Sequence, residues 1–214
     1  MTYAPKHRPD PLLDLAPRIS SVATLTALKA IPAKSRDHGA VKHVEADHSQ
    51  WYFHSSSALD GDDALVAEPA SGSGRWLRMP GRAYLSLPFT FETADATALL
   101  TLQAGQQLRL WDLYWEISTD LTGGASSAIG VSSNKTGYST KGDLLGGATG
   151  DVAASLTEAL SPTVGTIGAK LDGDDARAIF IEANTIRFDR ITSAFTAGAG
   201  NVVVVADILK NAGA

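Results

Sequence analysis

Gln106–Thr119, with the sequence QQLRLWDLYWEIST, decides the fold class of this chain. Its apolar residues alternate with polar ones at a period of two, and aromatic residues of this kind favour strands. Counted strictly by twos, one face carries four large apolar residues, Trp111, Leu113, Trp115 and Ile117. The other face carries three more beside two acids, namely Leu108, Leu110, Tyr114, Asp112 and Glu116. We therefore expect a strand that packs on both of its faces.

The same alternation continues through most of the chain after residue 81. Further strand-like runs are RAYLSLPFTFET at 82–93, SAIGVSS at 127–133, ARAIFIEANTIRFDRIT at 176–192 and NVVVVADIL at 201–209. Loops rich in Gly, Ser and Thr separate them, and Asp151–Ala159 is predicted as a single short helix. The chain is thus expected to be mainly β, with an antiparallel, jelly-roll-like β-sandwich over residues 82–214.

Residues 18–80 have a different pattern. A short helix is predicted from apolar residues at helical spacing, a capping serine and a terminating proline: Val22, Leu25, Leu28 and Ile31, with Ser20 or Ser21, and Pro32. Strands are predicted at Val41–Glu45, Gln50–Phe53 and Ala64–Ala67, and in GRWLRM at 74–79. The sequence thus predicts a small α+β module, a helix plus a hairpin, that ends at Met79-Pro80-Gly81 and has limited stability of its own.

Two tryptophans, Trp51 and Trp76, lie in predicted strands of this module. Bulky indoles in so small a unit are predicted to form its core. The alternative is a platform on which a sugar ring stacks.

Residues 1–17 contain four prolines, Pro5, Pro9, Pro11 and Pro17, around three leucines, Leu12, Leu13 and Leu15. Proline fixes φ and removes a backbone donor, so an extended segment is expected rather than a helix. It is either a disordered tail or an arm that buries its leucines on a neighbouring subunit.

Composition excludes several classes of function. The net charge of −5 argues against a nucleic-acid binder, which needs a basic face. The chain has no cysteine for disulfides or thiolate metal sites, and no apolar run long enough for a membrane span. The N-terminal stretch lacks a signal-peptide pattern, so we expect the protein to be made and kept, or assembled, in a cytoplasm. Residues 1–81 carry nine basic and nine acidic residues, whereas residues 82–214 carry nine and fourteen, which suggests two units with different surfaces.

The motifs that could carry chemistry are weak. LDGDDA occurs at 59–64 and again at 171–176, but neither copy has the calcium-loop spacing, so both are predicted to be turns at hairpin tips. GVSSNKT at 130–136 lacks the glycines of a phosphate-binding loop. His43, His48 and His54 are predicted to be polar edge residues rather than metal ligands. No nucleophile elbow is present, whereas a carboxylate pair for glycoside cleavage stays open. We therefore expect no enzyme, no cofactor and no metal.

Residues 21–79 resemble a segment that recurs in structural proteins of tailed bacteriophages. The likeness lies in the helix that ends at Pro32, the strand VKHVE, the aromatic WYF, the loop DGDDALVAEPASGSG and the closing GRWLR. The stretches SSAIGVSSNKTGYSTKGDLLGGATGD at 126–151 and RFDRITSAFTAGAGNVVVV at 187–205 look similar to β-sandwich proteins that coat phage capsids, often as trimers.

The resemblance implies a capsid decoration, or cement, protein on the virion surface. Its partners would be the major capsid protein and copies of itself in a homotrimer, with no nucleic acid and no membrane. Residues 18–80 would attach to the shell. The alternatives are a tail, baseplate or fibre-base subunit, or a carbohydrate-binding module.

Overall fold

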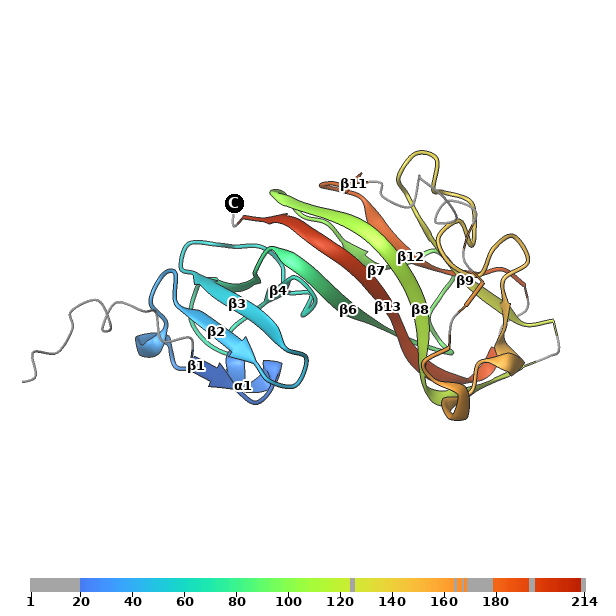
Figure 1. Cartoon of the computed structure of the whole chain (residues 1–214), viewed down its shortest axis with the longest axis horizontal. Coiled ribbons are helices and arrows are strands. Elements are labelled where there is room, and N and C mark those ends of the chain that lie inside the picture. Colours follow the sequence, from blue (N-terminus) through green and yellow to red (C-terminus); the bar gives the residue numbers. More distant parts are fainter. Residues whose placement is uncertain are drawn as a thin grey trace, which may run out of the picture.

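The computed structural model describes residues 20–123, 126–163, 165–166, 168, 179–192 and 195–212. The predicted arm at 1–17 and the second LDGDDA copy lie outside these ranges. Three β-sheets make up the described part, and antiparallel pairing dominates them (Figure 1). The prediction of a mainly β, antiparallel chain is confirmed.

The smaller sheet has the order β1-β2-β3-β5-β4. Its strands are β1 Ser20–Val22, β2 Val41–Val44, β3 Ser49–His54, β4 Val66–Ala67 and β5 Arg75–Arg78. Only β1 and β2 run parallel. The helix α1 Leu25–Lys29 and the 3-10 turn η1 Ala33–Ser35 connect β1 to β2.

The start of α1 differs from the prediction. Thr24 is the cap, since its side-chain oxygen accepts a hydrogen bond from the Ala27 amide at 3.1 Å. Ser20 and Ser21 lie in β1 instead, where they pair with Lys42 and His43. A strand precedes the helix because these residues complete the edge of the small sheet, a long-range contact that local spacing does not reveal.

The larger part has two four-stranded sheets. One has the order β11-β8-β13-β6, with β6 Gly81–Thr90, β8 Gln106–Gly123, β11 Ile179–Phe180 and β13 Phe195–Asn211. The other has the order β10-β9-β12-β7, with β7 Thr97–Thr101, β9 Ala128–Ser133, β10 Asp151–Val152 and β12 Thr185–Arg190. The helix predicted at 151–159 is wrong, because β10 is followed by two 3-10 turns, η2 Ala153–Ser155 and η3 Glu158–Leu160.

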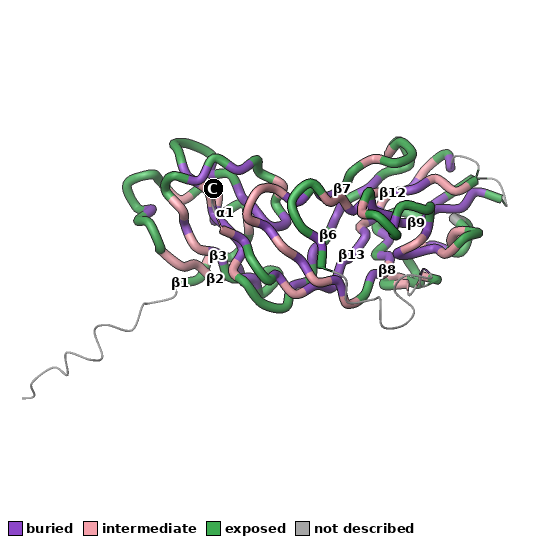
Figure 2. The backbone as a smooth tube through the Cα atoms, turned by 90° about the horizontal axis from the view of Figure 1, so that it is seen from above, coloured by how far each residue is buried: buried purple, intermediate pink, exposed green. Residues whose placement is uncertain are grey.

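Buried side chains of the two larger sheets form one hydrophobic core, in an arrangement compatible with a β-sandwich (Figure 2). Trp115 packs against Phe89, and Phe89 stacks on Phe188 of the other sheet with ring centroids 5.1 Å apart. The small sheet has its own core with α1, formed by Leu28, Val44, Trp51, Phe53, Ala67 and Trp76. Residues of the small sheet such as Leu65 and Leu77 nevertheless belong to the larger core, so apolar packing crosses Met79-Pro80-Gly81.

A β-bulge at Trp111 overturns the predicted facing of β8. Val205 of β13 pairs with Asp112, but the next residue, Ala206, pairs with Leu110, so Trp111 is an extra residue on β8. The bulge shifts the alternation by one position. Leu108 and Leu110 therefore lie on the core side together with Leu113, Trp115 and Ile117, and Trp111 is only partly buried.

A buried polar cluster around Asn211 joins the end of β13 to the small sheet. The Asn211 amide nitrogen donates to the carbonyl oxygens of Leu65 at 2.8 Å and Arg78 at 2.9 Å. Its side-chain oxygen accepts from Gln106 at 3.0 Å, and its backbone carbonyl accepts from the Tyr52 hydroxyl at 2.5 Å. Because Asn211 is only 2% exposed, each of these groups depends on its partner within the protein.

Replacing Asn211 with alanine should destabilise the protein by about 2–4 kcal/mol, because buried carbonyl and amide groups lose their partners. Chemical denaturation of wild type and variant measures this. Asn201→Ala is the matched control on the same strand, since the Asn201 amide donates to the Glu116 carboxylate at an exposed site. It should cost under about 1 kcal/mol; equal losses in the two variants would contradict the role given to the cluster.

Trp76→Ala should destabilise the protein by about 3–5 kcal/mol, the usual range for a large aromatic residue removed from a core. Trp76 is fully buried, and its ring centroid lies 5.2 Å from that of Phe53. Leu160→Ala, at an exposed position of η3, is the control with little expected effect. A thermal melt of Trp76→Ala that superimposes on wild type would place the indole outside the core.

Candidate functional site

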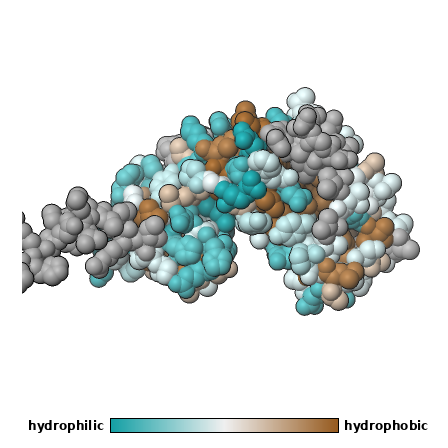
Figure 3. All heavy atoms as spheres, viewed as in Figure 1, coloured by the Kyte–Doolittle hydropathy of each residue, from teal (hydrophilic) through white to brown (hydrophobic). Residues whose placement is uncertain are grey.

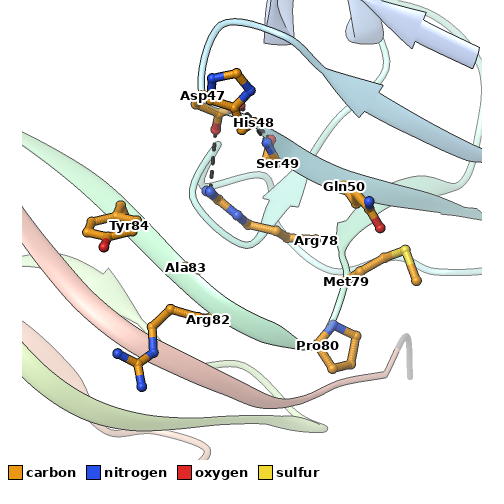
Figure 4. Close-up of a pocket in the computed structure, with 10 residues that line it drawn as sticks. All are labelled: Asp47, His48, Ser49, Gln50, Arg78, Met79, Pro80, Arg82, Ala83 and Tyr84. Carbon is orange, nitrogen blue, oxygen red and sulfur yellow. Dashed lines mark hydrogen bonds and ion pairs between the residues drawn. The ribbon is translucent and has the colours of Figure 1, made fainter.

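A cleft of about 310 Å³ lies between the small sheet and β6. The β2–β3 turn forms one side with Asp47 and His48, and β6 forms the other with Arg82 and Tyr84 (Figure 4). A second hollow of about 240 Å³ adjoins it and shares Asp47, Arg78 and Tyr84. The space-filling view shows the concave edge between the two parts of the molecule (Figure 3).

The β2–β3 turn is held by local hydrogen bonds. The Asp47 carboxylate accepts from the Ser49 amide at 3.2 Å and from the Ser49 hydroxyl at 2.6 Å. His48 has φ of 54°, a left-handed conformation that suits a tight turn. The other oxygen of Asp47 lies 3.4 Å from Arg78, so the turn is tied to the floor of the cleft.

Arg78 separates the two hollows and is nearly buried. Its guanidinium lies 5.8 Å from the Trp51 ring centroid and donates to the Ala64 carbonyl. Burial lowers the pKa of Arg78, and the Asp47 carboxylate opposes this change. The position of Arg78 is therefore fixed by contacts with three segments, which favours a rigid cleft.

The second feature of the site is the outer face of the β6–β13–β8 sheet, opposite the core. Tyr84 on β6 is 59% exposed and pairs with Val205, while Tyr114 on β8 pairs with Val203. These two valines lie outside the core cluster. We call Tyr84, Trp111, Tyr114, Val203 and Val205 the aromatic face. It meets the cleft at Tyr84, which lines both hollows.

Charged groups border the aromatic face at both ends. Next to the cleft, Arg82 Nε lies 2.6 Å from Asp207 Oδ1, and Trp111 Nε1 donates to Asp207 Oδ2 at 2.6 Å. The Arg82 guanidinium also lies 4.5 Å from the Trp111 ring centroid, within cation–π range. The hydrogen bond from Arg82 is the main reason why the pKa of Asp207 lies below its usual value.

Asp112 and Glu116 of β8 are exposed on the same side as Tyr114. Asp112 lies level with Tyr84, since both pair with Val205, and Glu116 lies farther along β8, where it pairs with Asn201. Burial raises the pKa of Tyr114, and the charges of Glu116 and Asp112 contribute. The aromatic face therefore has a basic residue beside the cleft, an exposed acid, Asp112, level with Tyr84, and a second acid, Glu116, farther along β8, which accepts a hydrogen bond from Asn201.

The two tryptophans singled out from the sequence do not belong to this site. Trp51 and Trp76 are fully buried, so neither indole is available to stack on a sugar. The arm residues Pro5, Pro9, Pro11, Leu12, Leu13 and Leu15 lie outside the described residues. Sequence reasoning did not predict Tyr84, Arg82 and Trp111 as site residues. Strict alternation assigned Trp111 to the core. Alternation also cannot show which face of a sheet is left unpacked by other elements, and this is what places Tyr84 and Arg82 at the surface.

The three histidines considered as a cluster are not brought together. His43 stacks near His48 with ring centroids 5.9 Å apart, whereas His54 contacts His38 at 4.8 Å. Across the described residues, no group of three or more His, Asp or Glu side chains is arranged to hold a metal ion.

The first LDGDDA copy stabilises a bend. One oxygen of Asp62 accepts hydrogen bonds from the amides of Ala64, Leu65 and Val66 at 2.9, 2.7 and 2.9 Å. The segment is not a hairpin tip as predicted, because β3, which precedes it, pairs with β5 rather than with β4. Burial raises the pKa of Asp62, and the three backbone hydrogen bonds oppose this shift.

Burial also raises the pKa of Asp189. Its carboxylate accepts from the Ser132 hydroxyl at 2.8 Å and from the Gly142 amide at 3.1 Å. It therefore holds a loop against β9 and β12, far along the chain from the cleft.

Comparison of the chain with protein-family models, with curated proteins and with solved structures gives no match. Within the described ranges, none of the helices is long and apolar enough to cross a membrane.

Asp207→Asn should lower the melting temperature at pH 7 but leave it nearly unchanged near pH 2. A carboxylate whose folded-state pKa is lowered adds stability above its ordinary pKa of about 3.9, and this stability is lost as the pH falls through the folded value. Thermal melts of both proteins between pH 2 and pH 7 measure the difference.

Asp37→Asn, at an exposed position, is the control and should leave the melting temperature unchanged at both ends of the range. A difference between wild type and Asp207→Asn that stays constant with pH would contradict the charge interaction with Arg82.

Proposed function

We propose that this chain is a structural subunit of a tailed-phage virion, and specifically a decoration protein that binds the major capsid protein and stabilises the shell. The larger body would be a jelly-roll-like sandwich, and residues 18–80 would be the attachment module. The proposal takes its family from the resemblance of residues 21–79 and its mode of action from the surface of the structure.

The aromatic face is the observation that carries the proposal. Subunit interfaces are enriched in Tyr, Trp and Arg. Tyr84, Trp111 and Tyr114 lie together over Val203 and Val205, with Arg82 paired to Asp207 at the border. A surface of this composition on a long sheet favours a subunit that binds neighbouring subunits in an assembly.

The junction of the two parts adds support. Asn211 ties β13 to the small sheet through buried hydrogen bonds, and apolar packing continues across the boundary. A rigid connection lets one part attach to a shell while the other contacts a neighbouring subunit. A tail, baseplate or fibre-base position uses the same surfaces and remains the alternative within the virion.

The exposure of Tyr84 also favours a second candidate function, the binding of carbohydrate. The Tyr84 ring is open to solvent and can stack on a sugar, while Asp112, level with it on β8, and Glu116 and Asn201, farther along the same face, can hydrogen-bond to the sugar hydroxyl groups. A carbohydrate-binding module would therefore use the aromatic face, and a glycan array probed with wild type and Tyr84→Ala separates this function from the structural one.

Quantitative mass spectrometry of purified virions tests the proposed function. For a decoration protein, we expect a copy number equal to that of the major capsid protein or a simple fraction of it. A few to a few tens of copies per particle would place the chain in the tail or connector. Absence from the particle would contradict a virion role altogether.

A further inference from the structure

We propose that the cleft and the aromatic face together bind residues 1–17 of a second copy of this chain. This binding specifies which surface of the proposed virion subunit contacts a neighbouring copy. It rests on the proposed function only in that a virion subunit is expected to self-associate. Cleft and aromatic face form one continuous surface, because Tyr84 belongs to both.

The hollow beside α1 matches the leucines of the segment. Its apolar lining consists of Leu25, Val44, Ala46 and Ala64, and Tyr84 and the charged Asp47, Asp63 and Arg78 line it as well. Leu12, Leu13 and Leu15 follow one another within four positions. The burial of two or three leucines supplies most of the free energy that a weak subunit contact needs.

The aromatic face matches the prolines. Proline-rich segments bind surfaces of aromatic side chains, since the extended proline helix loses little conformational freedom on binding. Pro5, Pro9 and Pro11 precede the leucines. If the leucines occupy the hollow beside α1, the prolines lie over Tyr84 and Tyr114 on the adjoining sheet.

The order of charges gives the segment a direction. Lys6 and Arg8 lie in its first half, and Asp10 and Asp14 in its second. On the acceptor surface, Glu116 lies on β8 at the end away from the cleft, whereas the cleft is lined by Arg82 and by Arg78 with its partner Asp47. The basic half therefore fits over β8, and the acidic, leucine-bearing half fits the cleft.

The spacing of these charges agrees. Arg8 and Asp14 are six residues apart, about 19 Å in a polyproline II segment. Glu116 and Arg82 pair with Asn201 and Asp207 of β13, which are also six residues apart, about 20 Å along a strand; because the two residues lie on opposite sides of β13, their diagonal separation is about 22 Å, a difference that their long side chains can span. One extended segment can thus bring Arg8 to Glu116 and Asp14 to Arg82 at the same time.

A second copy is the better donor of the segment than the same chain. β1 begins at Ser20 on the edge of the small sheet, and β2 and β3 separate it from β5, which leads into β6. β1 therefore forms the edge of the small sheet away from β5, whose Arg78 lines the cleft (Figure 1). Exchange of segments between copies generates a closed dimer or ring, in which each acceptor surface is filled.

The test measures self-association of the full chain by sedimentation velocity over a range of concentrations. The face variant carries Tyr84→Thr and Tyr114→Thr, because threonine suits a strand but removes the ring. The arm variant carries Leu12→Ser, Leu13→Ser and Leu15→Ser. Leu160→Ser, at an exposed apolar site on η3, is the matched control.

We expect wild type and control to associate alike, and each of the two variants to associate at least roughly tenfold more weakly. An equimolar mixture of face and arm variants should form heterodimers through one intact arm–face contact, and should therefore associate more weakly than wild type but more strongly than either variant alone. Near-UV circular dichroism of every variant verifies that the core is intact. A second pair, Glu116→Lys and Arg8→Glu, should lose association singly and regain it when both changes are made together.

A monomeric wild type at all concentrations, or variants that associate like wild type, would overturn the proposal. Weakened variants whose mixture fails to associate would show that the surface has another occupant. All of these measurements use purified protein. Absence of the chain from virions would therefore contradict the proposed function but would not affect the conclusion on self-association.

Discussion

The pairing of β13 with two partners is the interaction on which the rest of the structure depends. Over ten consecutive positions, from Ala199 to Ile208, it pairs with β6, and on its other side it pairs with β8 along almost its whole length. At its end, Asn211 fixes the small sheet through hydrogen bonds to Leu65 and Arg78. One strand therefore supports the larger core and determines where the smaller part lies.

Glycines permit this strand to follow its partners. A Cβ at Gly200 would lie 2.5 Å from the Glu116 carbonyl, and Gly198 has φ of 125°. The register of β13 against β8 shifts in this region, so the strand bends where it passes over β8. Larger residues here would separate the two strands and weaken the ladder that carries both the core and the aromatic face.

Sequence patterns predicted the strands of this protein well and their faces less well. Alternation located β6, β8, β9, β12 and β13, because each contributes alternate apolar residues to a common core. It assigned Trp111 wrongly, since the shift arises from the partner strand, where Val205 and Ala206 pair with Asp112 and Leu110. The strand β1 and the turns after β10 were missed for the same reason, as both depend on contacts with residues distant in sequence.

The candidate site could not have been predicted, because it depends on which sheet face has no cover. The run Val202–Val205 indicates a strand shielded on both sides, and the core covers only Val202 and Val204. On the other side, Val203 and Val205 are only 3% and 8% exposed, since neighbouring side chains flank them on the surface. No alternation rule distinguishes shielding by a second sheet from shielding by a row of surface residues.

The rigid junction explains how this surface can serve for binding. Asp47 and Arg78 hold the β2–β3 turn at the cleft, and Asn211 holds β5 against the end of β13. A partner that binds here does not have to order the two parts relative to each other, so less of the contact energy is lost on association. The buried polar groups of the junction thus support an exposed aromatic surface of defined shape, and this is the property that a subunit of an assembly requires.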